Sequence, residues 1–392
     1  MKNAILKAAL FTPMAHGQWG LPLLLWGAPG VAKTATIRAL AGCLRWHLEH
    51  LTPGERGEGA FGVTPVPDVV GKGTDKHTVL RYPPPEWVEA LLVGGEEVGL
   101  VFLDEINTAP PALQPALLGA IQERRIGGHA FGPRVRVLAA ANPTGQAAGG
   151  WDLAAPVANR LGHLDWAPPT AEEWGAWLLS GANGNGQTID AQAEETRVLA
   201  AWPDAFARAS GKVAAFLRRR PELLHKMPND GDPQMSRAWP SPRTWEYATR
   251  ALASAAIQGL SEEATSELCA AFVGNAAEAE LATWLATLDL PDPAEVLAGK
   301  VTWEPDFTRL DRTEAVLSGC AAIVAAHNKT NKALAAKDAE ALWSLLLKCD
   351  RAKDLTVTAA KLLVDLGYVA GRGALAALAG LNAVMQAAGG RS

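Results

Sequence analysis

"LPLLLWGAPGVAKTATIRAL", residues 21–40, runs from an apolar segment through a turn containing glycine and proline into a helical pattern. Pro22–Trp26 is short and apolar enough for a buried strand, and Ala35–Leu44 has the pattern of a helix. The octet GAPGVAKT between them differs by one residue from G-x-x-x-x-G-K-[ST]. In that pattern backbone N–H groups cradle phosphates, the lysine reaches the β and γ oxygens, and the hydroxyl binds Mg²⁺.

The one departure from the pattern is Ala32, which stands where glycine is expected. Alanine is a good helix former and Ala32 would lie at the helix start, so we expect a helical φ that needs no glycine. The free N–H groups and positive dipole end of a helix favour an anion, so phosphate binding should survive the substitution. The residues expected to hold the nucleotide are Gly27, Ala28, Pro29, Gly30, Val31, Ala32, Lys33, Thr34 and Ala35.

Composition sets outer limits on the function. With 392 residues, 48% of them hydrophobic, the chain can bury a sizeable core in more than one domain. The net charge of −5 gives no sign of a nucleic-acid binder. The four cysteines show no C-x-x-C spacing, which argues against disulfides and zinc and fits a reducing cytoplasm. No apolar run reaches the roughly 18 residues of a membrane span, so we expect a soluble protein.

The first 166 residues alternate short apolar runs with helical patterns, which is typical of a parallel sheet covered by helices on both faces. The expected strands are Leu23–Trp26, His47–Thr52, Gly99–Leu103, Val135–Ala140 and Gly162–Trp166. A helix over 111–125 is expected to pack on the sheet through Leu113, Leu117, Leu118 and Ile121. From Pro168 onward alanine-rich helical patterns predict a mostly helical second half.

A second signal, GLVFLDEIN at 99–107, places Asp104 and Glu105 at the carboxyl end of a buried strand, where open α/β sheets bind ligands. Asp104 could hold Mg²⁺ through its water shell, and Glu105 could polarise an attacking water. The alternative for two adjacent acids in this position is a helix N-cap. Because a phosphate loop precedes them, we favour the catalytic interpretation.

Three further polar residues are candidates for the same site. Asn142 could hydrogen-bond both the water and the γ-phosphate if the strand before it lies between the strands that carry the first two motifs. The alternative is a turn residue before Pro143. Arg160 precedes a short strand and Arg243 begins a helix. Either arginine could bind γ-phosphate in fork geometry, also from a neighbouring subunit; a surface salt bridge is the alternative.

In this order the motifs resemble the AAA+ ATPases, and within them the MoxR-like branch of dynein-related type. GAPGVAKT is similar to Walker A, VFLDEIN to Walker B, and ANP at 141–143 to the sensor 1 segment. The stretch DEINTAPPALQPALLGAIQERRI resembles the segment after Walker B in that branch, and VPDVVGK at 66–72 resembles the segment before its helical insert. The likeness covers residues 1 to about 250.

The resemblance implies a P-loop AAA+ core over 1–166 with its parallel sheet sandwiched by helices, an all-α lid over 167–300 and a helical C-terminal extension over 301–392. By this resemblance Lys33 and Thr34 would bind the phosphates and Mg²⁺, Asp104 would bind the metal, and Glu105 would activate the attacking water. Asn142 would be the sensor 1 residue and Arg243 the sensor 2 arginine. Arg160 would be the arginine finger that acts on the nucleotide of the adjacent subunit. The family reads D-R-F at the finger, whereas Asn159 and Leu161 flank this arginine, so Arg124 and Arg125 remain rivals.

By the same resemblance, the chain is expected to be a cytoplasmic, ring-forming ATPase, a hexamer that uses ATP and Mg²⁺. It would act as a chaperone or remodelling motor, or insert a metal cofactor, on a partner that carries a von Willebrand factor A domain. Two other classes stay open. One is a nucleotide-gated scaffold that binds ATP and oligomerises with little hydrolysis. The other is a DNA-directed motor, which the acidic charge disfavours.

Three other features carry weaker expectations. Residues 54–87 are rich in glycine and proline, with Phe61 and Val63 on either side of Gly62. In related motors loops from such a region face the central pore and grip a client protein, and a rigid surface loop is an equal alternative here.

His47 and His50, three apart, could suit a metal on a helix. No ligand-spaced carboxylate or cysteine accompanies them, so we expect a satisfied or exposed pair. Trp166, Trp174 and Trp177 are expected to pack in the core or at a domain junction.

Overall fold

The computed structural model describes residues 1–56, 60, 61, 65–92, 98–143, 145, 150–179, 188–287 and 290–369. The chain divides into two compact units. Unit 1 comprises Met1–Arg197, Lys226–Ala251 and Leu260–Asn275, and unit 2 comprises Val198–His225, Leu252–Gly259 and Ala276–Ser392. The division into three domains at residues 166 and 300 remains a prediction.

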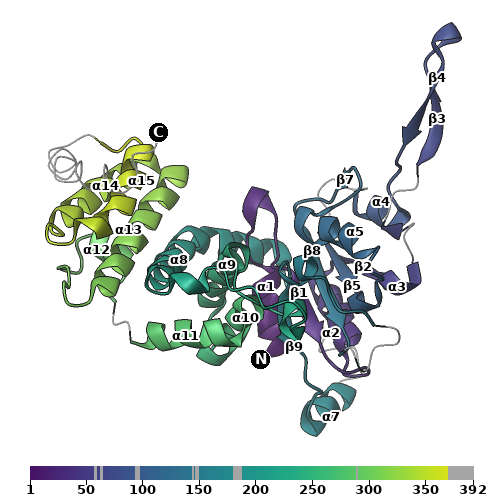
Figure 1. The fold of residues 1–392 in the computed structure, drawn as a ribbon, viewed down its shortest axis with the longest axis horizontal. Coiled ribbons are helices and arrows are strands. Elements are labelled where there is room, and N and C mark those ends of the chain that lie inside the picture. The colour runs from purple at the N-terminus through teal and green to yellow at the C-terminus, as the bar shows by residue number, and fades with distance from the viewer. Residues whose placement is uncertain are drawn as a thin grey trace. The chain divides into compact units, whose positions relative to one another are not determined.

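Unit 1 contains a five-stranded parallel sheet, which confirms the predicted α/β architecture (Figure 1). Its strand order is β2-β5-β8-β1-β9. The strands are β1 (Leu23–Trp26), β2 (His47–Leu51), β5 (Gly99–Leu103), β8 (Val135–Ala141) and β9 (Gly162–Asp165). Every residue of β1, β5 and β8 is buried, because a parallel sheet is covered on both faces, and Arg136 of β8 is the one charged residue in these three strands.

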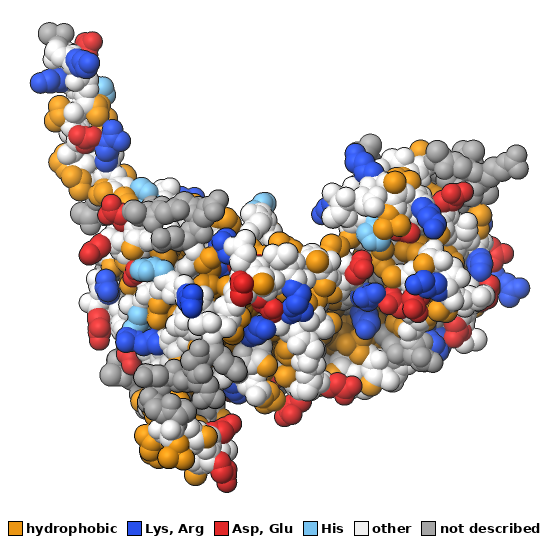
Figure 2. Space-filling view, turned by 180° about the vertical axis from the view of Figure 1, so that it is seen from behind, with side chains coloured by type: hydrophobic (Ala, Val, Ile, Leu, Met, Phe, Trp, Pro, Cys, Tyr) orange, Lys and Arg blue, Asp and Glu red, His pale blue; other side chains and the backbone are white. Residues whose placement is uncertain are grey.

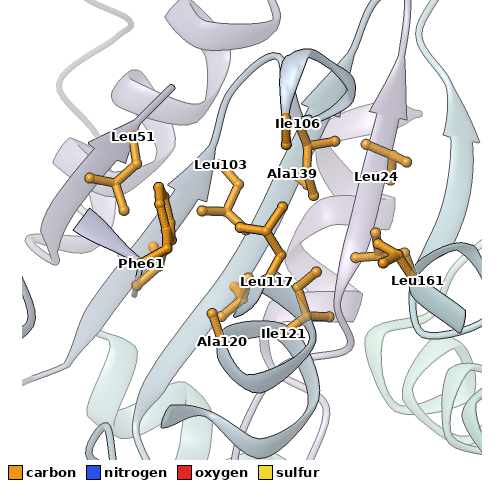
Figure 3. Packing of buried hydrophobic residues seen from close by; sticks show 14 of the residues in the cluster. Leu24, Leu51, Phe61, Leu103, Ile106, Leu117, Ala120, Ile121, Ala139 and Leu161 are labelled. Atoms are coloured by element: carbon orange, nitrogen blue, oxygen red, sulfur yellow. The ribbon is translucent and has the colours of Figure 1, made fainter. Parts of the chain in front are cut away.

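One face of this sheet is covered by the helices that precede and follow β5 in the chain. Side chains of α4 (Glu86–Leu92) and α5 (Gln114–Leu118) form one buried cluster with alternate residues of the strands. Figure 3 shows Leu117 and Ile121 over the sheet residues Leu103 and Ala139. On the opposite face α2 (Lys33–Leu44) and α1 (Lys2–Leu10) supply further buried leucine, isoleucine and alanine side chains.

The helix expected over 111–125 is shorter than predicted. It begins at Gln114, and a π-helical turn over Gly119–Glu123 replaces its second half. Arg124 then adopts a left-handed conformation with φ 52°, which ends the helix and leads into β6 (Arg125–Ile126), paired with β7 (His129–Ala130). Leu113, Leu117 and Ile121 are buried as expected, whereas Leu118 is half-buried.

An antiparallel hairpin extends away from the rest of unit 1 (Figure 1). Its strands are β3 (Val66–Val70) and β4 (His77–Arg81), and it follows the short helix α3 (Pro53–Arg56) in the chain. All described side chains of the hairpin strands are exposed or half-buried. The hairpin therefore contributes little to the core of unit 1.

Helices make up the second half of the chain, as predicted. They begin with α6 (Ala155–Ala158), α7 (Ala171–Leu179), α8 (Ala191–Arg219), α9 (Pro242–Gln258) and α10 (Glu262–Val273). Trp166 is buried, as expected for a core residue, whereas Trp174 and Trp177 are not in the core: they lie on α7 with 53% and 43% of their surface exposed. Packing of these two at a domain junction stays a prediction. Every described residue of α7 is exposed or half-buried, so this helix has no face in the core.

Unit 2 has a separate core built from helices. These include α12 (Pro293–Leu297), α13 (Leu310–Thr330), α14 (Lys332–Leu347) and α15 (Val357–Asp365), and α11 (Asn275–Ala286) precedes them in the chain. Val324 of α13 and Leu342 of α14 are fully buried in its cluster. The Asn331 side chain caps α14 by accepting a hydrogen bond from the Leu334 N–H. Of the helices in the described ranges, none is long and apolar enough to cross a bilayer.

Candidate nucleotide site

The loop between β1 and α2 has the backbone geometry that its glycines permit. A Cβ on Gly27 would lie 2.5 Å from the Trp166 carbonyl oxygen, so a larger residue would collide with backbone. Gly30 has φ +79°, a region that side-chain-bearing residues rarely adopt. The Gly27 N–H donates to the Ala141 carbonyl and ties the loop to the end of β8.

The expectation for Ala32 was wrong. Its φ of 65° and ψ of 23° place it in the left-handed region, immediately before α2. The carbonyl of Ala32 still accepts the helix hydrogen bond from the Thr36 N–H, at 2.9 Å. The path of the preceding loop, rather than helix propensity, therefore determines this conformation, and alanine occupies a position that favours glycine.

Ala32→Gly is expected to raise the free energy of unfolding by about 0.5–1 kcal/mol, because relief of the left-handed strain exceeds the added entropy of the unfolded chain. Ala39→Gly is the matched control, since Ala39 is exposed within α2 and the same change there should lower stability by about 0.5–1 kcal/mol. Urea denaturation measures both variants. A loss of stability in Ala32→Gly similar to that in Ala39→Gly would contradict the strain.

Lys33 is the best-buried charge of the loop, with 7% of its surface exposed. Its Nζ donates to the carbonyls of Gly27 at 2.6 Å and Ala28 at 3.0 Å, and to Asn142 Oδ1 at 2.9 Å. Burial lowers the pKa of the Lys33 ammonium, and the negative charges of Asp104 and Glu105 oppose that shift. The lysine therefore lies at the mouth of the loop with two carboxylates close to it.

The side chains of Thr34 and Asp104 lie close enough to bind one metal ion together. The Thr34 hydroxyl donates to Asp104 Oδ2 at 2.6 Å, and Asp104 Oδ1 accepts the Glu105 N–H at 3.0 Å. Hydroxyl and carboxylate oxygens are the ligands that Mg²⁺ prefers. These two residues thus fit the predicted Mg²⁺ site.

Glu105 has a left-handed backbone, with φ 50° and ψ 42°. It precedes the 3-10 turn Ile106–Thr108, yet its side chain makes no capping hydrogen bond to that turn within the described structure. The alternative of an N-cap therefore does not account for the Glu105 carboxylate. A strained backbone of this kind persists where the surrounding structure imposes it, which is common at functional sites.

Asn142 joins the lysine to Glu105. Its Oδ1 accepts from Lys33 and its Nδ2 donates to Glu105 Oε1 at 3.4 Å, an orientation that follows because lysine only donates and a carboxylate only accepts. The condition set for Asn142 is met, since β8 lies between β5 and β1 in the sheet. Nδ2 of the fully buried Asn107 donates a hydrogen bond of 2.9 Å to the Asn142 carbonyl oxygen.

The two predicted arginines lie together, apart from this cluster. Arg160 donates to Gln122 and, at 2.7 Å, to the Pro156 carbonyl, while Arg243 at the start of α9 donates to Asn159 Oδ1 at 3.4 Å. Burial, and then the nearby charge of Arg243, lowers the pKa of Arg160. Within the described residues, no hydrogen bond or ion pair joins either arginine to Lys33 and its partners.

The rival arginines differ in exposure. Arg124 is buried, donates to the Gly20 carbonyl at 2.8 Å, and has its pKa lowered to about 10 by burial, so it cannot reach another subunit. Arg125 is exposed and donates to the Gly127 carbonyl. Arg160 and Arg125 therefore remain as candidates for the arginine that acts between subunits.

The segment 54–87 contains both a buried and an exposed part. Phe61 is buried against Trp87, with ring centroids 5.9 Å apart, so it does not face a pore; Val63 lies outside the described residues. In the hairpin Val69 and Leu80 are 63% and 61% exposed. Figure 2 shows hydrophobic side chains along this hairpin.

The strand register separates the two faces of the hairpin. Pro67 pairs with Leu80 and Val69 with Thr78, and side chains alternate between faces, so one face carries no charge. On the other face Arg81 donates to Asp68 at 2.5 Å. The hairpin thus presents an uncharged, largely apolar surface.

His47 and His50 lie on β2 rather than on a helix, and each has a carboxylate partner. His47 pairs with Glu49, and His50 Nε2 lies 3.1 Å from Asp104 Oδ2. Sequence reasoning missed the second contact, because only the pairing of β2 with β5, which sets His50 opposite Phe102, brings it to Asp104. Among the described residues no three His, Cys, Asp or Glu side chains are grouped as a metal site.

No protein-family model matches the chain. A search of curated proteins finds no match either. Among solved structures, the chain is similar to a candidate ATPase from Cytophaga hutchinsonii, at 16% identity and a TM-score of 0.43, covering 73% of this chain and 88% of the other.

Proposed function

We propose that this chain is an AAA+ ATPase of MoxR-like type that uses ATP and Mg²⁺. The observation that supports it most is a closed set of contacts at the carboxyl edge of β1, β5 and β8. Lys33 contacts Asn142, Asn142 contacts Glu105, the Glu105 N–H contacts Asp104, and Asp104 contacts Thr34, the neighbour of Lys33. Three segments far apart in the chain supply these groups.

Each member of the set has a role in phosphate chemistry. Lys33 exchanges its carbonyl partners for phosphate oxygens and stabilises their charge. Thr34 and Asp104 would hold Mg²⁺, which neutralises negative charge on the phosphates. Glu105 accepts a proton from the attacking water, and Asn142 orients that carboxylate. The resulting reaction is hydrolysis of ATP to ADP and phosphate.

The proposal includes a ring, in which Arg160 acts on the nucleotide of the adjacent subunit. Support comes from its position beside Arg243 and apart from Lys33, Asp104 and Glu105 of its own chain. Two neighbouring arginines repel each other unless an anion lies between or beside them. Glu123 of the same chain acts on Arg160 as one such anion, and we propose that a neighbouring subunit's phosphate supplies a second, with Arg243 at the same interface rather than over its own nucleotide.

We further propose a protein as the client of this ATPase. The uncharged face of the hairpin, with Val69 and Leu80 exposed, offers a surface for apolar segments of a partner. The proposal also includes a partner that carries a von Willebrand factor A domain. It further includes a cytoplasmic location and a hexameric ring for this chain. Either remodelling or metal-cofactor insertion fits such a motor.

Lys33→Ala is expected to weaken ATP binding by about 2–5 kcal/mol, roughly 30-fold to several thousand-fold in Kd, because the phosphates lose their buried positive partner. Isothermal calorimetry with the full chain measures this. Lys212→Ala, on the exposed surface of α8, is the matched control and should bind like wild type. Wild-type affinity in a folded Lys33→Ala protein would show that this loop is not the phosphate site.

A further inference from the structure

His50 lies between the predicted metal carboxylate and an arginine of α2. Its Nε2 is 3.1 Å from Asp104 Oδ2 and its Nδ1 is 2.9 Å from Arg38 Nη2. The ring stacks on Phe102 with a centroid distance of 5.4 Å and an interplanar angle of 22°. The side chain is 27% exposed. Contacts on two edges and one face therefore define its orientation.

The Arg38 contact also determines where the imidazole proton is. A guanidinium can only donate, so Nδ1 must accept, and the proton of the neutral ring lies on Nε2. Nε2 then donates to Asp104 Oδ2. His50 is therefore aligned as a hydrogen-bond donor to this carboxylate, with no change of protonation needed.

Three donors from the described part of the chain reach the Asp104 carboxylate. The Thr34 hydroxyl and His50 Nε2–H reach Oδ2, and the Glu105 N–H reaches Oδ1. If Thr34 turns its hydroxyl oxygen to Mg²⁺, Oδ2 loses that donor and keeps His50. Groups that hydrogen-bond a metal-binding carboxylate orient it and raise metal affinity.

We propose that His50 is a positioning residue that, held by Arg38, orients the Asp104 carboxylate for the metal of the nucleotide. This inference rests on the proposed function. It assigns a role to the end of β2, which carries none of the motifs of the nucleotide site. If His50 has this role, the affinity of the protein–nucleotide complex for the metal depends on His50. The affinity of the protein for the metal-free nucleotide does not depend on His50.

The test measures the Kd of the non-hydrolysable analogue AMPPNP in EDTA, and the Kd of Mn²⁺ for the protein–AMPPNP complex by electron paramagnetic resonance. We expect His50→Ala and His50→Phe to weaken Mn²⁺ about 10–100-fold and to leave metal-free AMPPNP affinity unchanged within about twofold. His50→Phe keeps an aromatic ring against Phe102 and so separates hydrogen bonding from stacking.

Two further variants sharpen the result. His50→Gln should recover Mn²⁺ affinity to within about threefold of wild type, because its amide can donate to Asp104 and accept from Arg38. His47→Ala is the matched control: the same residue type on the same strand, exposed and paired with Glu49, so its Mn²⁺ affinity should equal that of wild type.

Unchanged Mn²⁺ affinity in both His50→Ala and His50→Phe would overturn the inference, and so would an equal loss of metal-free AMPPNP binding. Failure of the proposed function looks different. Wild type would then bind no AMPPNP, or Lys33→Ala would bind it as wild type does, and the inference about His50 would fall with it.

Discussion

Arg160→Ala is expected to lower the kcat of ATP hydrolysis about 10³–10⁵-fold, the range in which an arginine finger contributes to phosphoryl transfer. ATP affinity should change little, since Arg160 contacts Gln122 and Pro156 and has no hydrogen bond to the Lys33 cluster in the described structure. Steady-state ATPase assays and calorimetry on the same preparation separate the two quantities.

Arg125→Ala is the matched control for this prediction. Arg125 is an exposed arginine whose guanidinium donates to the Gly127 carbonyl, and we expect near wild-type turnover without it. If Arg125→Ala loses activity and Arg160→Ala does not, the finger is Arg125. Arg160→Lys should remain impaired, because a lysine cannot form the two parallel hydrogen bonds of a guanidinium.

Mixed rings test whether Arg160 acts between subunits. A Glu105→Gln subunit retains Arg160, and an Arg160→Ala subunit retains Glu105, so one of the two possible mixed interfaces is complete. Random mixing in equal amounts makes about one quarter of the interfaces complete in a closed ring. Activity should return accordingly. No recovery in rings confirmed to contain both variants would count against action in trans.

Glu105→Gln is expected to lower kcat about 10²–10⁴-fold, because the amide cannot accept the proton of the attacking water. The amide has nearly the same shape and can keep the contact to Asn142, so ATP affinity and oligomer formation should persist. Glu89→Gln, an exposed acid on α4, is the matched control and should hydrolyse ATP like wild type.

The same pair of proteins distinguishes the enzyme from the nucleotide-gated scaffold. If wild type and Glu105→Gln bind ATP and oligomerise but both hydrolyse it at the same near-zero rate, the scaffold is correct. A large rate difference between them supports the ATPase.

Much of the nucleotide site could be predicted because its information is local. Gly27 and Gly30 are glycines that the loop geometry requires, and Lys33, Thr34, Asp104 and Glu105 sit at positions that short motifs identify. Apolar runs likewise predicted β1, β5 and β8, since strands buried on both faces consist mainly of apolar residues. Arg136 in β8 is the charged exception, and its buried guanidinium donates to Glu195.

Other features needed information from outside the local stretch. For Asn142 the sequence by itself favoured a turn residue over a site residue, and only the strand order, with β8 between β5 and β1, met the condition for the site. Ala32 was assigned a helical φ from propensity, yet the path of the loop imposes a left-handed one. Propensity describes a residue in an average helix, and it carries no information on the chain that leads into the helix.

Local sequence alone therefore determined the α/β class, the phosphate loop and the acidic strand end, because each depends on residues adjacent in the chain. Only the tertiary structure decided which distant groups meet: His50 with Asp104, Arg160 with Arg243, and Phe61 with Trp87. Such contacts depend on strand order and helix packing, which arise from the burial of many side chains at once and leave no mark in any single short segment.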